Sequence, residues 1–132
     1  MPTPAVINPV MQKNASDCAI ASLAMLLGRS YEEVSKKALE LFDKPHQKGL
    51  TTREIQRLAR AVRGQSLQSI KIKNANLDEE TGMLFVKRGT EEHACVLFEG
   101  VIFDPADGLI WNVPTYFASS TKKCYPIGLL KP

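Results

Sequence analysis

The strongest constraint on the fold is a change in the hydrophobic pattern about halfway along the chain. Before Gly64 the apolar residues recur at helical spacing, and after it they form short runs separated by glycine and proline. With 44% hydrophobic and 23% charged residues among 132, the composition suits one hydrophobic core and argues against disorder. We therefore predict an α+β fold in a single domain over residues 1–132, with N-terminal helices packed on one side of a C-terminal antiparallel β-sheet.

The first predicted helix places a cysteine in its first turn. The stretch "QKNASDCAIASLAMLLG" predicts a helix from about Asp17 to Leu27, with Ser16 or Asp17 as its cap and Gly28 as its stop. Cys18 then lies where unpaired backbone N–H groups and the helix dipole favour a thiolate over a thiol. This is a favourable position for a nucleophilic cysteine.

Two more helices are predicted in the first half. Each begins with a hydroxyl residue followed three positions later by glutamate, the spacing of a capping box: Ser30 with Glu33, and Thr51 with Glu54. A polar loop around Pro45 is expected between them. The second half then predicts a meander of strands, carried by the runs "SLQSIKI", "MLFVKRG", "HACVLFEG", "VIFDPADG", "LIWNVP" and "YPIGLL".

One predicted hairpin, "EEHACVLFEGVIFDPADG", brings chemically useful side chains together. A two-residue turn at Glu99–Gly100 sets Cys95 opposite Asp104, so that His93, Cys95 and Asp104 share one face of the sheet. His93 and Asp104 become diagonal neighbours that their side chains can bridge. A carboxylate in this position can orient an imidazole and stabilise its protonated form, and the imidazole can keep a nearby cysteine ionised.

Gln12 adds a possible fourth component. It lies six residues before Cys18, across the short polar loop "KNASD". A side-chain amide there could donate to the oxygen of a substrate carbonyl beside the backbone N–H of Cys18, forming an oxyanion hole.

The order Gln, helix-starting Cys, strand His, downstream Asp resembles that of the papain-like cysteine peptidases. It is most similar to the bacteriocin-processing, double-glycine-leader peptidases over roughly residues 10–111, through "SDCAIASLAMLLG", "KGLTTREIQRLARAVRG" and "HACVLFEGVIFDPADG". The resemblance implies a papain-like fold and cysteine peptidase activity on a peptide or protein. It further implies Cys18 as nucleophile, His93 as general base, Asp104 as orienting residue and Gln12 as oxyanion donor.

The sequence departs from that family pattern in three respects. Ala19 replaces the glycine that usually follows the cysteine, and the hairpin between His93 and Asp104 is shorter than in many relatives. The family domain is often fused to a membrane transporter, which this sequence does not contain. Free-standing relatives in bacteria or their phages could cut other peptides, so a double-glycine leader is not assumed as the substrate.

Two other functions are compatible with the same residues. Cys-His-Asp sets also carry out acyl transfer and deamidation on related folds. A catalytically silent relative would instead bind a peptide or partner protein without cutting it.

Other chemically reactive residues are given weaker interpretations. A zinc site at Cys95 and His93 lacks the usual ligand spacing, so we expect neither a metal nor a cofactor. Asp107 is the alternative to Asp104 if the latter points away. His46 is expected to be solvated, and Cys124 to be packed in the core or exposed. Trp111 and Tyr116 could line a substrate groove, but packing in the core or at a sheet edge is the preferred interpretation.

Charge and hydropathy exclude several classes of partner. The net charge is +3 without a basic block, so a nucleic-acid partner is not expected. The longest apolar run is too short to span a membrane, and the N-terminus does not resemble a secretory signal. Three irregularly spaced cysteines favour reduced thiols in the cytoplasm. The oligomeric state is left open by the sequence.

Overall fold

The computed structural model describes residues 7–14, 16–119 and 123–132. The helices in these ranges are α1 (Cys18–Leu27), α2 (Tyr31–Leu41), α3 (Pro45–Lys48), α4 (Thr52–Arg63), the short 3-10 helix η1 (Ile72–Asn74) and α5 (Val113–Ala118). The strands are β1 (Gln68–Ile70), β2 (Thr81–Arg88), β3 (Glu91–Phe98), β4 (Val101–Phe103), β5 (Ile110–Asn112) and β6 (Cys124–Lys131).

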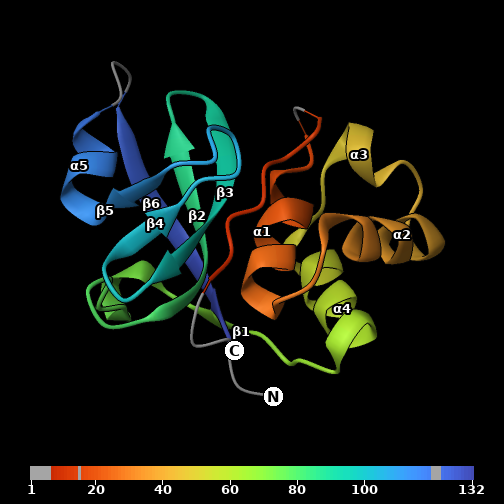
Figure 1. Ribbon diagram of the computed structural model, residues 1–132. Coiled ribbons are helices and arrows are strands. Elements are labelled where there is room, and N and C mark those ends of the chain that lie inside the picture. The colour runs from red at the N-terminus through yellow and green to blue at the C-terminus, as the bar shows by residue number, and fades with distance from the viewer. Residues whose placement is uncertain (1–6, 15, 120–122) are drawn as a thin grey trace.

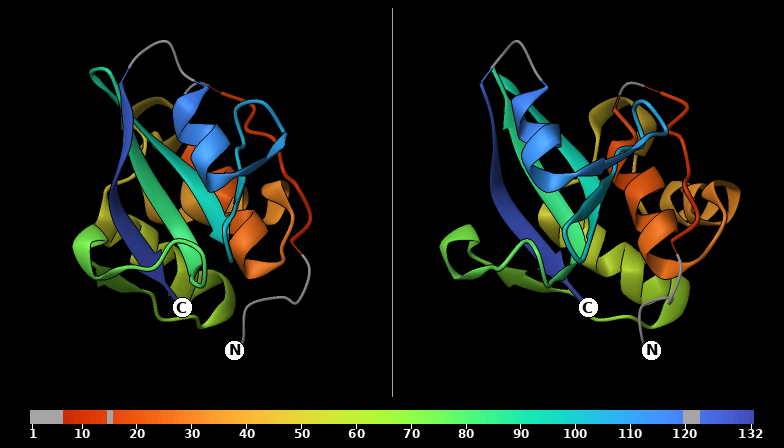
Figure 2. Two further views of the ribbon diagram at one scale, coloured as in Figure 1. Left: turned by 90° about the vertical axis from the view of Figure 1, so that its left-hand side faces the viewer. Right: turned by 60° about the vertical axis from the view of Figure 1, so that its left-hand side comes forward.

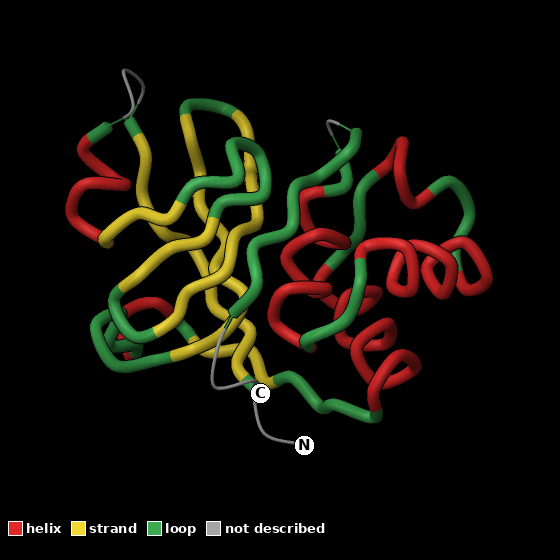
Figure 3. The backbone as a smooth tube through the Cα atoms, in the orientation of Figure 1, coloured by secondary structure: helices red, strands yellow, loops and turns green. Residues whose placement is uncertain are grey.

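The helices and the strands form two sides of the molecule. Figures 1 and 3 show α1 to α4 gathered on one side of the sheet, with α1 next to β3. The core between them contains most of α1 together with one face of the sheet, including Met83, Ala94 and Val96. The predicted α+β class, with N-terminal helices packed against an antiparallel sheet, is confirmed.

Helix α1 is the central element of this core. Residues 19–27 are all buried, and Gly28 ends the helix in the left-handed conformation, as predicted. The prediction for its start is partly wrong. Asp17 occupies the N-cap position, but its side chain makes no capping hydrogen bond, because the carboxylate is engaged elsewhere.

The capping signals mark the starts of α2 and α4 correctly. Thr51 and Glu54 form the complete capping box, whereas at α2 the Ser30 hydroxyl accepts from the Glu33 N–H and the Glu33 carboxylate contacts Arg29 instead. The loop expected around Pro45 contains the short helix α3, with that proline in its first turn, where its missing N–H costs nothing.

The sheet is not the simple meander that the strand runs predict. Within the described residues, the six strands have the order β1-β6-β2-β3-β4-β5, so β6 lies between β1 and β2. Turn residues report hairpins between neighbouring strands, but they carry no information about a C-terminal strand that pairs with earlier ones. At Gly82 a side chain would come within 2.4 Å of the Leu130 oxygen, so this close strand pairing requires glycine.

Helix α5 was not predicted from the sequence. The stretch 109–114, expected to be a strand, forms only β5 before Asn112 caps α5 by accepting from the Thr115 N–H. Asparagine followed by Pro114 is an ordinary helix-start signal that the apolar run obscured. Figure 2 shows α5 over the sheet face opposite α1, so the face away from the N-terminal helices also carries a helix, which the sequence did not predict. The second face carries its own core, which includes Cys95, Leu97 and Tyr116.

The β3–β4 hairpin has the predicted register. Glu99 and Gly100 both have positive φ, as a tight two-residue turn requires, and Phe98 pairs with Val101. His93 and Cys95 are two residues apart on β3, so both side chains point to the face that carries the second core. Asp104 follows directly after β4. This register places the His93 and Asp104 side chains within reach of each other.

None of the helices in the described segments combines the length and the apolar character needed to cross a membrane.

Candidate active site

Cys18 lies at the junction of α1 and the sheet. It is the first residue of α1, and its Sγ accepts a hydrogen bond from the Ala94 N–H of β3 at 3.4 Å. The thiol is partly buried and not part of a disulfide. The predicted position in the first turn is therefore confirmed, and the sulfur is held against the strand that carries His93.

His93 and Asp104 form a short hydrogen-bonded pair. His93 Nε2 lies 2.7 Å from Asp104 Oδ1, and the same oxygen accepts from the Ala106 N–H at 2.8 Å. The Asp104 side chain is only 3% exposed. With Nε2 engaged by the carboxylate, Nδ1 is the ring nitrogen that remains for a partner on the other side of the imidazole.

The second oxygen of Asp104 has its own partners. The Tyr116 hydroxyl of α5 donates to Oδ2 at 2.7 Å, and Arg88 Nη2 of β2 donates to that hydroxyl at 3.0 Å. Arg88 Nη2 also lies 3.7 Å from Asp104 Oδ2. A buried carboxylate with these partners remains charged, because each contact stabilises the anion.

The pKa values of Cys18 and His93 shift in opposite directions. Burial alone would raise the pKa of the Cys18 thiol. A hydrogen bond to His93, the charge of that ring and the N–H groups of Ala94 and Ala19 outweigh burial and lower the pKa. Burial likewise works against the charged imidazole, but the contacts with Asp104 and Cys18 raise the pKa of His93 to about 9. Both shifts favour a thiolate beside an imidazolium over the neutral pair.

Asp104 completes this charge arrangement. Burial opposes its ionisation, but hydrogen bonds from His93, Tyr116 and the Ala106 N–H, with the charge on His93, lower the pKa of the carboxyl group. Asp104 is therefore an anion at neutral pH, where His93 is protonated, and each group stabilises the charge of the other.

Gln12 lies on the segment that approaches α1. Its backbone N–H donates to the Pro105 oxygen at 2.9 Å, one residue after Asp104, and its side-chain Nε2 donates to the Asn14 oxygen at 3.0 Å. Gln12 is thus attached to the loop that follows β4 and to the turn that precedes Cys18.

A cleft of about 800 Å³ adjoins the Cys18 and His93 side chains. Its walls come from the start of α4 and from strands β2 and β6, through residues that include Thr51, Phe85 and Gly128. Asp104 does not line this cleft and lies behind His93. The arrangement exposes a sulfur and an imidazole to a ligand while the carboxylate is kept away from it.

Several weaker interpretations are also resolved by the geometry. His46, expected to be solvated, is partly buried and lies 2.8 Å from Ser35 Oγ through Nε2. Asp107 accepts from the Leu109 N–H and from the Trp111 indole, so it serves the turn. Within the residues that the structure describes, no group of three His, Cys, Asp or Glu side chains is placed to hold a metal ion.

Tyr116 and Arg88 are the contributors that sequence reasoning missed. Tyr116, expected in the core or at a sheet edge rather than in a substrate groove, is a core residue whose hydroxyl donates to Asp104. Strand alternation does give a signal for Arg88, because two-residue steps along β2 put it on the face that carries His93. No local signal links Tyr116 to Asp104, since α5 itself was missed.

The fold of the chain matches a solved structure, and its sequence matches the model of a known protein family. The chain is similar in fold to the crystal structure of a double-glycine-motif protease from an AMS/PCAT transporter in complex with the leader peptide, with a TM-score of 0.62 and 23% identity. The match covers 98% of this chain and 94% of the other. No curated protein matches the sequence. The model of the peptidase C39 family, whose members are cysteine peptidases, matches residues 7–120. The chain therefore belongs to the peptidase C39 family.

Proposed function

We propose that this cysteine peptidase cleaves a peptide bond with Cys18 as nucleophile, His93 as general acid and base, Asp104 as the residue that orients His93, and Gln12 as oxyanion donor. The observation that carries the proposal is the continuous contact from the Cys18 thiol through His93 to Asp104, with the first two groups facing the cleft.

In the first half of the reaction, the Cys18 thiolate attacks the carbonyl carbon of the scissile bond and forms a C–S bond. The carbonyl oxygen becomes an oxyanion, which the Cys18 N–H and the Gln12 amide stabilise. The intermediate collapses, the C–N bond breaks, and the His93 imidazolium gives its proton to the leaving amine. The product is a thioester on Cys18 and a neutral imidazole.

In the second half, His93 acts as a base toward water. It takes a proton from the water that attacks the thioester carbonyl, the C–S bond breaks, and the peptide leaves as a carboxylic acid. The thiolate–imidazolium pair is restored. Asp104 remains charged throughout and holds the ring in orientation, because its pKa lies below its usual range.

The substrate of this reaction is a peptide or a peptide segment of a protein. The solved structure with a similar fold was crystallised with a leader peptide, and it is a double-glycine-motif protease. Peptides with paired glycines before the cleaved bond are therefore the first substrates to test. The three cysteines are not paired in disulfides, which supports a reducing, cytoplasmic setting for the proposed peptidase.

The test is turnover by wild type, Cys18→Ala and a matched Cys124→Ala control, followed by mass spectrometry. A set of synthetic peptides with and without a Gly-Gly pair serves as substrate. We expect the wild type and Cys124→Ala to break a peptide, and Cys18→Ala to be inactive with an unchanged melting temperature. Hydrolysis by Cys18→Ala at the wild-type rate would contradict the mechanism.

The same experiment separates the rival functions. Deamidation or acyl transfer would change the mass of the peptide without a chain break. A silent binding domain would retain peptides, and its Cys18 would react with iodoacetamide no faster than an ordinary thiol.

A further inference from the structure

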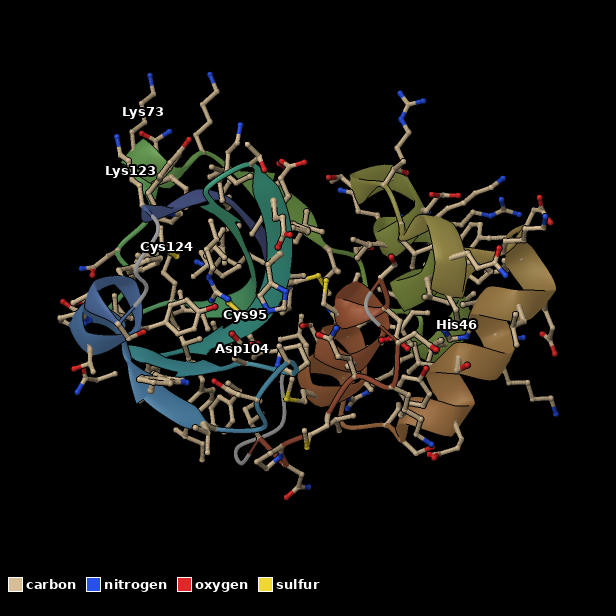
Figure 4. All side chains as sticks on the ribbon, turned by 90° about the horizontal axis from the view of Figure 1, so that it is seen from above. His46, Lys73, Cys95, Asp104, Lys123 and Cys124 are labelled. Carbon is tan, nitrogen blue, oxygen red and sulfur yellow. The ribbon has the colours of Figure 1, made fainter. Side chains whose placement is uncertain are left out.

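A second cluster of polar side chains lies beside Cys18 on the helical side of the molecule. The carboxylate of Asp17 is fully buried, although this residue directly precedes the cysteine. The hydroxyl of Tyr31 in α2 donates to Asp17 Oδ2, and His46 Nδ1 of α3 lies 3.4 Å from the same oxygen. Figure 4 shows His46 among the helices, well apart from Asp104 on the sheet side. The mechanism proposed above does not use this cluster.

The cluster fixes the carboxylate from several directions. His46 Nε2 lies 2.8 Å from Ser35 Oγ, so α2 and α3 both hold the imidazole next to Asp17. Burial, the hydrogen bond to Asp17 and its negative charge raise the pKa of Tyr31 to about 12, so the phenol remains a donor. A buried carboxylate with this many contacts has a defined position and cannot rotate freely.

Ser35, His46 and Asp17 have the connectivity of a hydrolase triad, but they lack its surroundings. Ser35 lies in the interior of α2 and does not line the cleft that Cys18 lines. The Asp17 oxygen that faces His46 also accepts from the Tyr31 hydroxyl. A role in positioning accounts for these contacts better than a second nucleophile does.

The other contacts of Asp17 lead to the segment that carries Gln12. Asp17 Oδ1 accepts from the Asn14 N–H at 3.1 Å, and Oδ2 accepts from Asn14 Nδ2 at 3.3 Å. The Asn14 oxygen in turn accepts from Gln12 Nε2 at 3.0 Å. A chain of hydrogen bonds therefore runs from the buried carboxylate through Asn14 to the amide of Gln12.

We propose that Asp17, held by Tyr31 and His46, is a positioning residue that sets the orientation of the Gln12 amide through Asn14. This inference rests on the proposed function, in which Gln12 is the oxyanion donor. Asp17 affects the stabilisation of the oxyanion and leaves the reactivity of the Cys18 thiol unchanged.

The test compares two reactions of Cys18 in Asp17→Asn. Alkylation by iodoacetamide needs the thiolate but forms no oxyanion, whereas hydrolysis of a Gly-Gly peptide needs both. Because loss of one oxyanion donor costs about 10²–10³ in rate, we expect a misplaced Gln12 to lower kcat about 10–100-fold with little change in KM. The alkylation rate should stay within about threefold of wild type. Asp78→Asn, the same change at an exposed loop residue, serves as the control and should alter neither rate.

A double variant shows whether Asp17 acts through Gln12. If it does, Gln12→Ala/Asp17→Asn loses no more activity than Gln12→Ala alone, because the amide is already gone. Losses that multiply, or a parallel fall in alkylation and hydrolysis, would overturn the proposal.

A measurement without substrate keeps the inference separate from the peptidase assignment. The side-chain amide signals of Gln12 in ¹H–¹⁵N spectra, assigned with Gln12→Ala, should shift in Asp17→Asn and, less strongly, in Tyr31→Phe. Tyr31→Phe retains the Asp17 carboxylate, so its Gln12 amide signals serve as the test if Asp17→Asn does not fold. Unchanged Gln12 signals in a folded variant overturn the positioning role even if hydrolysis is established, whereas shifted signals support it even if Cys18→Ala keeps hydrolysing peptide.

Discussion

Two clusters with the same kinds of side chain flank Cys18. On the sheet side, Asp104 contacts His93 and Tyr116, and on the helical side Asp17 contacts His46 and Tyr31. The carboxylates are 3% and 0% exposed, and the imidazoles 14% and 20%. Burial and composition therefore do not distinguish the two clusters.

What distinguishes them is the surroundings of each imidazole. His93 lies 2.7 Å from its carboxylate, interacts with the Cys18 thiol and borders the cleft. His46 lies 3.4 Å from its carboxylate, and its other nitrogen faces Ser35. An Asp-His-Tyr set becomes a proton-transfer device where the second nitrogen faces a nucleophile, and a structural anchor where that nitrogen faces a helix side chain.

The comparison is tested most directly by the same substitution at both histidines. His93→Gln should lower kcat/KM for peptide hydrolysis about 10²–10⁴-fold, because the proton donor to the leaving amine is lost. His46→Gln should lower it less than about tenfold, since its role is indirect. Steady-state kinetics on one peptide, with melting curves to confirm folding, provides the measurement. Equal losses at the two positions would show that the clusters are not functionally different.

The pH dependence sharpens the comparison. In the proposed mechanism His93 must be protonated to release the amine, and its pKa of about 9 means that hydrolysis should decline above pH 9, by about tenfold per pH unit. On the acid side, thiolate formation should begin below the ordinary thiol range, because the Cys18 pKa is lowered. His46→Gln should change neither the acid side nor the alkaline side of the pH–rate profile. Activity that still rises above pH 10 in the wild type would contradict the assignment of His93.

The smallest expected effects come from the two tyrosines. Tyr116→Phe and Tyr31→Phe each remove a hydrogen-bond donor to a buried carboxylate. In urea unfolding, each variant should therefore have a free energy of unfolding about 1–3 kcal/mol lower than wild type. Tyr116→Phe should in addition slow Cys18 alkylation at acid pH, because loss of this hydrogen bond raises the pKa of Asp104 and weakens the imidazolium.

Tyr31→Phe should leave the alkylation rate unchanged. Tyr125→Phe, at an exposed position, is the matched control and should stay within about 0.5 kcal/mol of wild type. A slower alkylation in Tyr31→Phe than in Tyr116→Phe would reverse the roles given to the two clusters.

Local signals in the sequence predict the sheet-side pair well. Alternation along β3, with a two-residue turn at Glu99–Gly100, is enough to bring His93 and Asp104 to one face. Helix-start chemistry places Cys18 in the first turn of α1. These predictions succeed because each depends on residues that are close in sequence or on one hairpin.

The helical-side cluster could not be predicted in this way. His46 reaches Asp17 because α3 packs near the start of α1, and no periodicity reports that contact. The same holds for β6 between β1 and β2, and for Tyr116 on α5. Such contacts join elements that are distant in sequence, and they are fixed by packing of the whole core.

The two ends of the short segment 12–14 are attached to different halves of the molecule. Gln12 is bound through its N–H to Pro105 on the sheet side, and Asn14 is bound to Asp17 on the helical side. Two residues of extended chain reach about 7 Å, so this tether limits how far the halves can separate near Cys18 while both attachments persist. A bulky inhibitor that forces the helical and sheet sides apart must first break one of these two attachments. Narrow, extended molecules are therefore the better starting point for inhibitors.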